Sequence, residues 1–130
     1  MITGVNHVTL VVADLERSLG FWRELLGLTL RARSARLAYL EGGSLWLCLE
    51  YGTPAPARDD SHIAFSCAPE DFATLEARLA NVPHWKRNRS EGASLYILDP
   101  DSHKLEIHLC TLESRLAHYR ATRPEGMQIF

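Results

Sequence analysis

The chain has 130 residues, which is enough for about one domain with its own core. It carries 14 Lys and Arg against 16 Asp and Glu residues, a formal net charge of −2, which gives no argument for binding nucleic acid or a membrane surface. No apolar run approaches the ~18 residues that a membrane helix needs, and the N-terminus lacks a secretory-signal pattern. Cys48, Cys67 and Cys110 lie in apolar segments without CxxC spacing and are expected to be reduced. We therefore expect a cytoplasmic protein.

The first half of the chain predicts a strand, a helix and three further strands. Residues 2–12 alternate as a strand does, Asp14 is a plausible N-cap, and an apolar stripe at helical spacing ends at Gly27. Three short strands are expected next, with a Gly-Gly turn between the last two, at 28–33, 36–41 and 44–51.

The second half repeats this order after a linker-like stretch at 52–60. Its expected elements are a strand at 61–67, a helix at 69–81 and strands at 83–87, 93–98 and 103–109, and a terminal helix follows at 111–121. The prediction is a single α+β domain over 1–130, built from βαβββ modules at 1–51 and 61–110. Because each module is too small to hold a core alone, the two should pair into a curved mixed sheet with helices outside and a cleft inside.

A histidine stands at the same point of each repeat, His7 in Asn-His-Val-Thr-Leu and His62 in Ser-His-Ile-Ala-Phe. In both repeats small or polar residues share the histidine's face of the strand, and the opposite face is apolar. Glu106 lies on the last expected strand between apolar neighbours. Two histidines and one glutamate from strands can form a three-ligand metal site with room for a substrate.

These residues also have ordinary structural interpretations. A lone strand histidine is commonly structural, the cationic run at 86–89 is typical of a solvated patch, and Tyr39 and Trp46 would by default be core aromatics. The segment with Arg115 would by default be a surface helix. The remaining histidines have no repeat partner and are interpreted as surface or supporting residues: His84, His103, His108 and His118.

The order of elements, with His7, His62 and Glu106 as placed, resembles the vicinal-oxygen-chelate superfamily, which includes glyoxalases, extradiol dioxygenases and fosfomycin-resistance enzymes. Within it, the segment Trp-Lys-Arg-Asn-Arg-Ser-Glu-Gly-Ala-Ser-Leu-Tyr at 85–96 resembles the fosfomycin-resistance glutathione transferases of the FosA type. Further similar segments cover nearly the whole chain, at 6–10, 38–40, 45–49, 98–101 and 114–116.

This resemblance implies an enzyme that opens the epoxide of fosfomycin with the glutathione thiolate. Mn²⁺ would be held by His7, His62 and Glu106, and the resemblance implies a domain-swapped homodimer in which His7 comes from one subunit and the other two ligands from its partner. Thr9 would lie near the developing oxyanion, and Tyr39 would assist thiol ionisation.

The resemblance also implies two further groups of residues. The antibiotic would be surrounded by Trp46, Lys86, Ser90, Tyr96 and Arg115. A loop binding K⁺ would contain Asn88, Ser90, Glu91, Gly92 and Ser94.

Several residues depart from the family pattern and leave the nucleophile open, namely Ser34, Glu50, Asp60, Ile63 and Ser102. The alternatives within the group are a fosfomycin hydrolase and a transferase of another thiol. Glyoxalase I is a rival from the same superfamily, but enzymes of that kind use four protein ligands. The strand at 45–49, which would supply the fourth, has no suitable acidic residue. An extradiol dioxygenase with Fe²⁺ and a non-catalytic, bleomycin-binding type of drug-binding module are the remaining alternatives.

Overall fold

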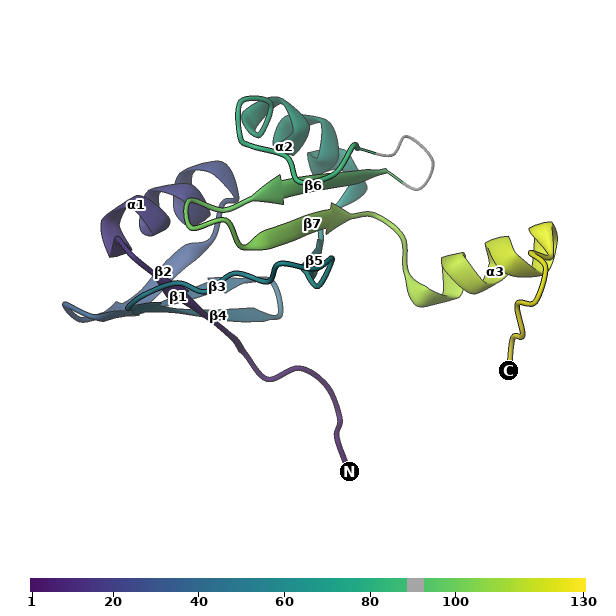
Figure 1. Cartoon of the computed structure of the whole chain (residues 1–130), viewed down its shortest axis with the longest axis horizontal. Coiled ribbons are helices and arrows are strands. Elements are labelled where there is room, and N and C mark those ends of the chain that lie inside the picture. The colour runs from purple at the N-terminus through teal and green to yellow at the C-terminus, as the bar shows by residue number, and fades with distance from the viewer. Residues whose placement is uncertain (89–92) are drawn as a thin grey trace.

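The structure is a computed structural model that describes residues 1–88 and 93–130. The first module comprises β1 (Val8–Val12), α1 (Leu15–Gly20), the π-helical turn η1 (Phe21–Leu25), β2 (Thr29–Arg33), β3 (Leu37–Gly42) and β4 (Leu45–Tyr51). The second comprises β5 (Ile63–Ser66), the 3-10 turn η2 (Pro69–Asp71), α2 (Phe72–Arg78), β6 (Ser94–Leu98) and β7 (Lys104–His108). The terminal helix α3 (Leu112–Thr122) follows, and Figure 1 shows it standing away from both modules.

Each module forms its own mixed sheet with its first strand at an edge. The strand orders are β1-β4-β3-β2 and β5-β7-β6. β1 runs parallel to β4 and β5 runs parallel to β7, whereas the other pairs are antiparallel. Because β1 and β5 are edge strands, each has one row of backbone groups that lies outside its own sheet. The two modules are thus built in the same way around their first strands.

Two expected strands begin later than predicted, and a third expected strand is not formed. The strands expected over 2–12 and 61–67 begin only at β1 and β5, so His7 and His62 directly precede a strand instead of opening it. The strand expected over 83–87 is replaced by a single antiparallel bridge between His84 and Ile97. Pro83 has no N–H to donate, so this stretch begins without a ladder bond, although its carbonyl accepts from Leu98 N at 2.8 Å. Among the described residues, the second module thus has a single bridge where its second strand was expected.

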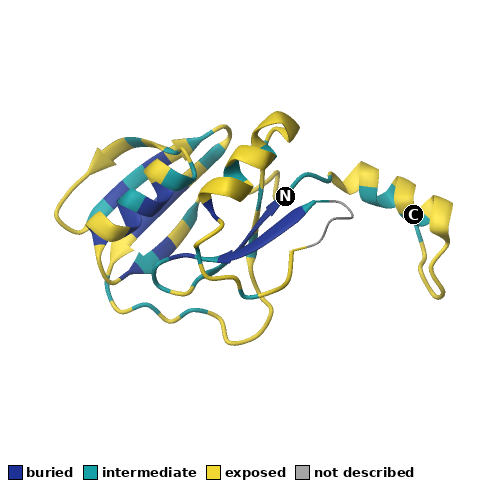
Figure 2. Cartoon of the chain, turned by 90° about the horizontal axis from the view of Figure 1, so that it is seen from above, coloured by how far each residue is buried: buried dark blue, intermediate teal, exposed yellow. Residues whose placement is uncertain are grey.

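The helix of the first module has the expected ends and covers one face of the first sheet. The Asp14 side chain accepts a hydrogen bond from Arg17 N at 3.0 Å, and Gly27 supplies the positive φ of +76° at which the helical segment stops. Four residues of the inner face of the sheet are fully buried beneath this segment, namely Val12, Leu40, Leu47 and Leu49. Figure 2 shows this band of buried strands beneath the helix.

The core extends across both modules. Trp22, only 1% exposed, meets the Phe65 ring of β5 edge-to-face at 5.7 Å between centroids. The same cluster contains Leu10 from the first module and Leu95 and Leu105 from the second. Neither module buries this surface without the other, as expected for such small units.

A polar turn also joins the modules; we call residues 99–103 the junction turn. The Asp101 carboxylate accepts from Ala13 N at 3.2 Å and from the Arg17 guanidinium at 3.0 Å. The His103 ring donates through Nε2 to the Val11 carbonyl at 2.8 Å. Ser102 adopts φ +69°, a left-handed conformation that favours glycine. The junction turn fixes the second sheet against the start of the first helix.

No helix in the two described ranges is long and apolar enough to cross a membrane. The terminal helix α3 begins at a capping box, in which Thr111 and Ser114 exchange side-chain to backbone hydrogen bonds. Its Leu112 is 71% exposed, so this side chain faces solvent in the single chain.

Candidate active site

The second module brings two of the expected metal ligands together. His62 Nε2 lies 3.0 Å from Glu106 Oε2, and His62 Nδ1 lies 2.7 Å from the carbonyl oxygen of Asp60. Because a carbonyl only accepts, Nδ1 carries a proton, and without a metal Nε2 donates its own proton to Glu106. A metal bound between the two would replace that proton and take the Nε2 lone pair. Two ligand atoms at right angles around one ion, with bonds of ~2.1 Å, stand ~3 Å apart. The His62–Glu106 pair therefore fits a shared divalent metal.

Glu106 lies on β7 in a polar pocket and is 8% exposed. Burial alone would raise the pKa of its carboxyl group, but hydrogen bonds from Ser94, His62 and Tyr96 and the nearby His108 outweigh burial, so this pKa lies below its ordinary value. Glu106 thus remains an anionic ligand at neutral pH, as binding of a cation requires.

Trp85 supports this half of the site, a role that the sequence analysis did not assign. Its indole N–H donates to the Leu105 carbonyl at 3.0 Å. Its ring lies 5.1 Å from that of His62 and 5.2 Å from that of Tyr96. The Lys86 ammonium is 5.3 Å from the ring of Tyr96, the residue whose hydroxyl is hydrogen-bonded to Glu106.

The first module carries the other expected residues on the open face of its sheet. His7 Nδ1 lies 2.8 Å from the Asn6 side-chain oxygen, which leaves Nε2 as a lone-pair donor. The His7 ring stacks 4.7 Å from Trp46, and Trp46 meets Tyr39 edge-to-face at 5.3 Å. Trp46 is nevertheless 40% exposed.

Thr9 and Tyr39 flank Cys48 in one row across this face, because both pair with it in the strand register. Burial raises the pKa of the Cys48 thiol, and a hydrogen bond from Thr9 partly opposes this shift. The row places both expected catalytic hydroxyls on the same side of the sheet as His7.

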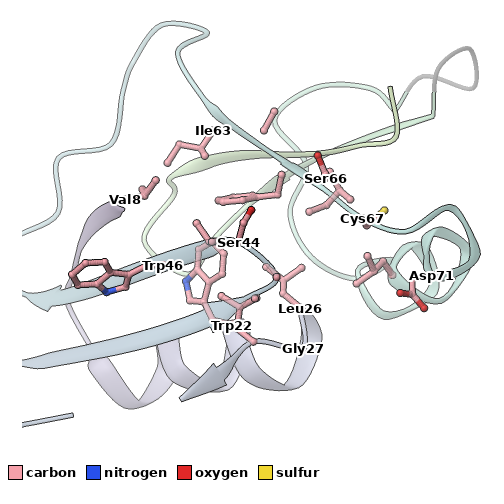
Figure 3. Close-up of a pocket in the computed structure, with 18 of the residues that line it drawn as sticks. Val8, Trp22, Leu26, Gly27, Ser44, Trp46, Ile63, Ser66, Cys67 and Asp71 are labelled. Atoms are coloured by element: carbon pink, nitrogen blue, oxygen red, sulfur yellow. The ribbon is translucent and has the colours of Figure 1, made fainter. Parts of the chain in front are cut away.

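A single chain does not unite the two half-sites. Within the described ranges, no group of three or more His, Cys, Asp or Glu residues is close enough to hold a metal. A cavity of about 860 Å³ lies between the modules, and its lining includes His7 and Trp46 but neither His62 nor Glu106. Figure 3 shows Trp22 and Trp46 on one side of this cavity and the segment from Ile63 to Cys67 on the other.

The remaining expected site residues are only partly gathered. Tyr96 and Ser94 are buried beside Glu106. The Asn88 side chain accepts from Tyr96 N at 3.2 Å, so it anchors the start of the expected K⁺ loop to β6. Arg115 lies on α3, away from the sheets (Figure 1). Ser90, Glu91 and Gly92 of the expected loop lie outside the described residues.

Two histidines without a repeat partner have specific contacts. His103 joins the modules through Val11, and His108 Nδ1 lies 2.7 Å from Ser94 Oγ and 3.3 Å from Glu106 Oε1. The spacing Glu-Ile-His on a strand was an available signal for His108, because residues two apart share a face.

The repeated strand–helix units, with a histidine before each first strand and a carboxylate on the last, define the class of protein. Residues 4–107 match the model of the Glyoxalase/Bleomycin resistance protein/Dioxygenase superfamily, and the chain belongs to that superfamily.

Within the superfamily, the chain is similar to fosfomycin-resistance proteins. It is 51% identical to the glutathione transferase FosA of Serratia marcescens, over 98% of this chain and 95% of that protein. It is 33% identical to the metallothiol transferase FosB of Staphylococcus haemolyticus, over 95% of this chain and 96% of that protein.

Solved structures of the same group are similar throughout the fold. The fosfomycin resistance protein FosX of Mesorhizobium loti superimposes with a TM-score of 0.78 at 30% identity, over 89% of this chain and 99% of that one. A mutant of FosX from Listeria monocytogenes, complexed with Mn(II) and 1S,2S-dihydroxypropylphosphonic acid, gives 0.79 at 29% identity, over 89% and 99%.

Proposed function

We propose that this protein is a metal-dependent glutathione transferase that inactivates fosfomycin by adding the glutathione thiolate to its epoxide. The observation that carries the proposal is the 51% identity to FosA over 98% of the chain. The paired His62 and Glu106, with a second lone-pair histidine at His7, are the donor set that this chemistry needs. A cytoplasmic location remains a prediction of the sequence.

His7, His62 and Glu106 would hold the metal ion. Two imidazoles and a carboxylate suit Mn²⁺, and bound Mn²⁺ would supply Lewis acidity for opening the epoxide. His62 and His7 support this assignment because in each the Nδ1 proton is donated to an oxygen, which leaves Nε2 available. Glu106 contributes one negative charge in buried surroundings.

The substrate's phosphonate requires positive charge and hydrogen-bond donors. Lys86 is a cation beside the second half-site, 5.3 Å from the Tyr96 ring, and the Tyr96 hydroxyl is directed toward Glu106. Arg115 would add a second cation if α3 docks over the site in the assembled protein. Ser90 would supply another hydroxyl, and Thr9 and Trp46 would approach from the first half-site.

Tyr39 would assist ionisation of the thiol, since its ring borders Trp46 and its row faces the same side as His7. Glu50 and Ser34 lie on exposed backbone near this row, where the family pattern differs. Another thiol and water are the alternative nucleophiles. The relatives include a metallothiol transferase, FosB, and a further fosfomycin resistance protein, FosX, so the group is not limited to glutathione transferases by name. The higher identity to FosA favours glutathione.

A homodimer would complete each site from two chains. The single chain leaves His7 apart from the His62–Glu106 pair, exposes Trp46 and leaves α3 standing free. β1 and β5 are both edge strands, so β1 of one subunit can lie beside β5 of its partner and extend the sheet. This arrangement would bring His7 of one chain to the ligand pair of the other.

K⁺ would bind the loop formed by Asn88, Ser90, Glu91, Gly92 and Ser94, adding positive potential beside the phosphonate. Asn88 supports the idea only indirectly, by anchoring the loop to β6. Activity should rise with K⁺ at constant ionic strength, with Na⁺ a poor substitute, whereas equal rates in the two salts would remove the K⁺ site from the proposal.

The test is incubation with fosfomycin, Mn²⁺ and K⁺, with and without glutathione, followed by ³¹P NMR. A new phosphonate resonance that requires glutathione supports the transferase. A product formed without thiol indicates the hydrolase, and unchanged fosfomycin that stays bound indicates a drug-binding module.

A further inference from the structure

His108 lies at the end of β7, two residues after Glu106, and the period of a strand puts both side chains on one face. In the register of the second sheet, His108 pairs with Ser66 on one side and with Ser94 on the other. The row through His108 is therefore adjacent to the row through Glu106.

The contacts of His108 connect it to the carboxylate by two routes. Its Nδ1 lies 3.3 Å from Oε1 of Glu106 and 2.7 Å from the hydroxyl oxygen of Ser94. The Ser94 hydroxyl is itself hydrogen-bonded to Glu106. Because an ionised carboxylate only accepts, Ser94 donates to Glu106, and its oxygen accepts the proton on His108 Nδ1.

The two oxygens of Glu106 therefore face different partners. Oε1 lies beside His108, and Oε2 lies 3.0 Å from Nε2 of His62, the nitrogen that would bind the metal. Ser94 is 2% exposed and the His108 side chain 21%, so water has little access to compete for Oε1. The terminal torsion of a glutamate is otherwise broad and allows both oxygens to turn toward a cation.

We propose that His108 is a positioning residue that holds Oε1 of Glu106, directly and through Ser94, so that Glu106 binds the metal through Oε2 alone. The inference rests on the proposed metal site and adds a residue and a coordination mode to it. Loss of such a supporting hydrogen bond commonly weakens metal affinity by about 10- to 100-fold.

Two substitutions separate this role from simple packing. His108→Asn keeps a nitrogen donor near the position of Nδ1, whereas His108→Leu keeps a similar volume without a donor. His118→Leu, on the exposed part of α3, is the matched control. The Mn²⁺ dissociation constant is measured without substrate, from the electron paramagnetic resonance signal of free Mn²⁺. We expect weaker binding by about 10- to 100-fold in His108→Leu, with near-parental binding in His108→Asn and in the control.

Infrared difference spectra give a second readout that a packing defect would not produce. A carboxylate bound through one oxygen has a wider splitting between its asymmetric and symmetric stretches than one bound through two. The two stretching bands of Glu106 are identified by their absence in Glu106→Gln. Their separation should become smaller in His108→Leu and stay at the parental value in His108→Asn. Ser94→Ala should change the Mn²⁺ dissociation constant and the Glu106 splitting in the same direction as His108→Leu. It replaces His108→Leu in the test if that variant does not fold.

The inference is overturned if His108→Leu and Ser94→Ala bind Mn²⁺ like the parent with the same splitting. It is also overturned if His108→Asn is as weak as His108→Leu, because the donor would then not matter. Either result leaves the proposed function standing, since the parent still binds Mn²⁺. A parent protein that binds no Mn²⁺ overturns both.

Discussion

Glu106 and His7 are expected to bind the same ion, yet one chain surrounds them very differently. Glu106 is 8% exposed and is held by hydrogen bonds from Ser94, His62 and Tyr96. His7 is exposed, stacks on the 40% exposed Trp46 and has only the Asn6 side chain as its hydrogen-bond partner in the described structure. The second module is therefore preorganised within its own chain, whereas the first presents its residues on an open face. The difference is what the proposed homodimer would explain, because a second chain would then cover the first half-site.

The largest expected effect is on the preorganised half. Glu106→Gln removes the buried negative charge from the metal site and should weaken Mn²⁺ binding by more than the ~100-fold that loss of a supporting contact costs. Isothermal titration with Mn²⁺ measures this effect. Glu113→Gln, on the exposed start of α3, is the control for charge. Parent-like titration of Glu106→Gln would show that the site is misplaced.

Mixed dimers test whether the open half-site is completed by another chain. His7→Ala and Glu106→Ala should each be inactive, and random exchange of the two should restore one site in each mixed dimer. About a quarter of the parental activity should return, because about half of the dimers are then mixed. Exchange is verified by mass spectrometry of the intact complex. No recovery after exchange would mean that all three ligands act within one chain.

Asp101→Ala should have a moderate effect on stability, because it removes contacts that hold the two modules together. This buried carboxylate accepts from Ala13 N and from Arg17, so its loss leaves a backbone donor near the junction turn without its partner. We expect the free energy of unfolding to fall by about 1–3 kcal/mol, measured by urea denaturation at fixed protein concentration. Glu125→Ala in the exposed C-terminal segment should change it by less than about 0.5 kcal/mol. Equal stability of both variants would show that the junction turn is not a strong link.

The smallest expected effect concerns the pH dependence of stability at Asp99. This side chain is 4% exposed, and Oδ2 has no hydrogen-bond partner among the described residues. Burial raises the pKa of its carboxyl group above the unfolded value, despite hydrogen bonds from the amides of His103 and Asp101. Its stabilising contribution is therefore complete below the unfolded pKa of about 3.9 and is lost as pH rises through the folded pKa.

Asp99→Asn should consequently lose less stability than the parent between about pH 4 and neutral pH. Thermal unfolding across this range measures how steeply stability falls with pH in the parent and in Asp99→Asn. Asp60→Asn, at an exposed position, is the control. A parental slope in Asp99→Asn would show that Asp99 is not the titrating group.

Much of the local structure followed from the sequence, because period and capping act over a few residues. Alternation located both sheets, and Asp14 and Gly27 marked the ends of the first helical segment. The repeat of His7 and His62 indicated equivalent positions, although both residues directly precede their strands and were expected within them. The strand expected at 83–87 is reduced to a bridge between His84 and Ile97, because Pro83 has no N–H for a ladder bond and Trp85 donates its indole N–H to the Leu105 carbonyl. The superfamily was recognisable because its motifs are continuous segments.

What the sequence by itself determined is the repeated unit, the superfamily and the residue types available for a metal site. Only the tertiary structure decided which side chains meet. It paired His62 with Glu106, placed His108 and Trp85 around them, and joined the modules through Asp101. These contacts link strands through register and docking between modules, which depend on packing of the whole chain and not on the spacing of neighbouring residues.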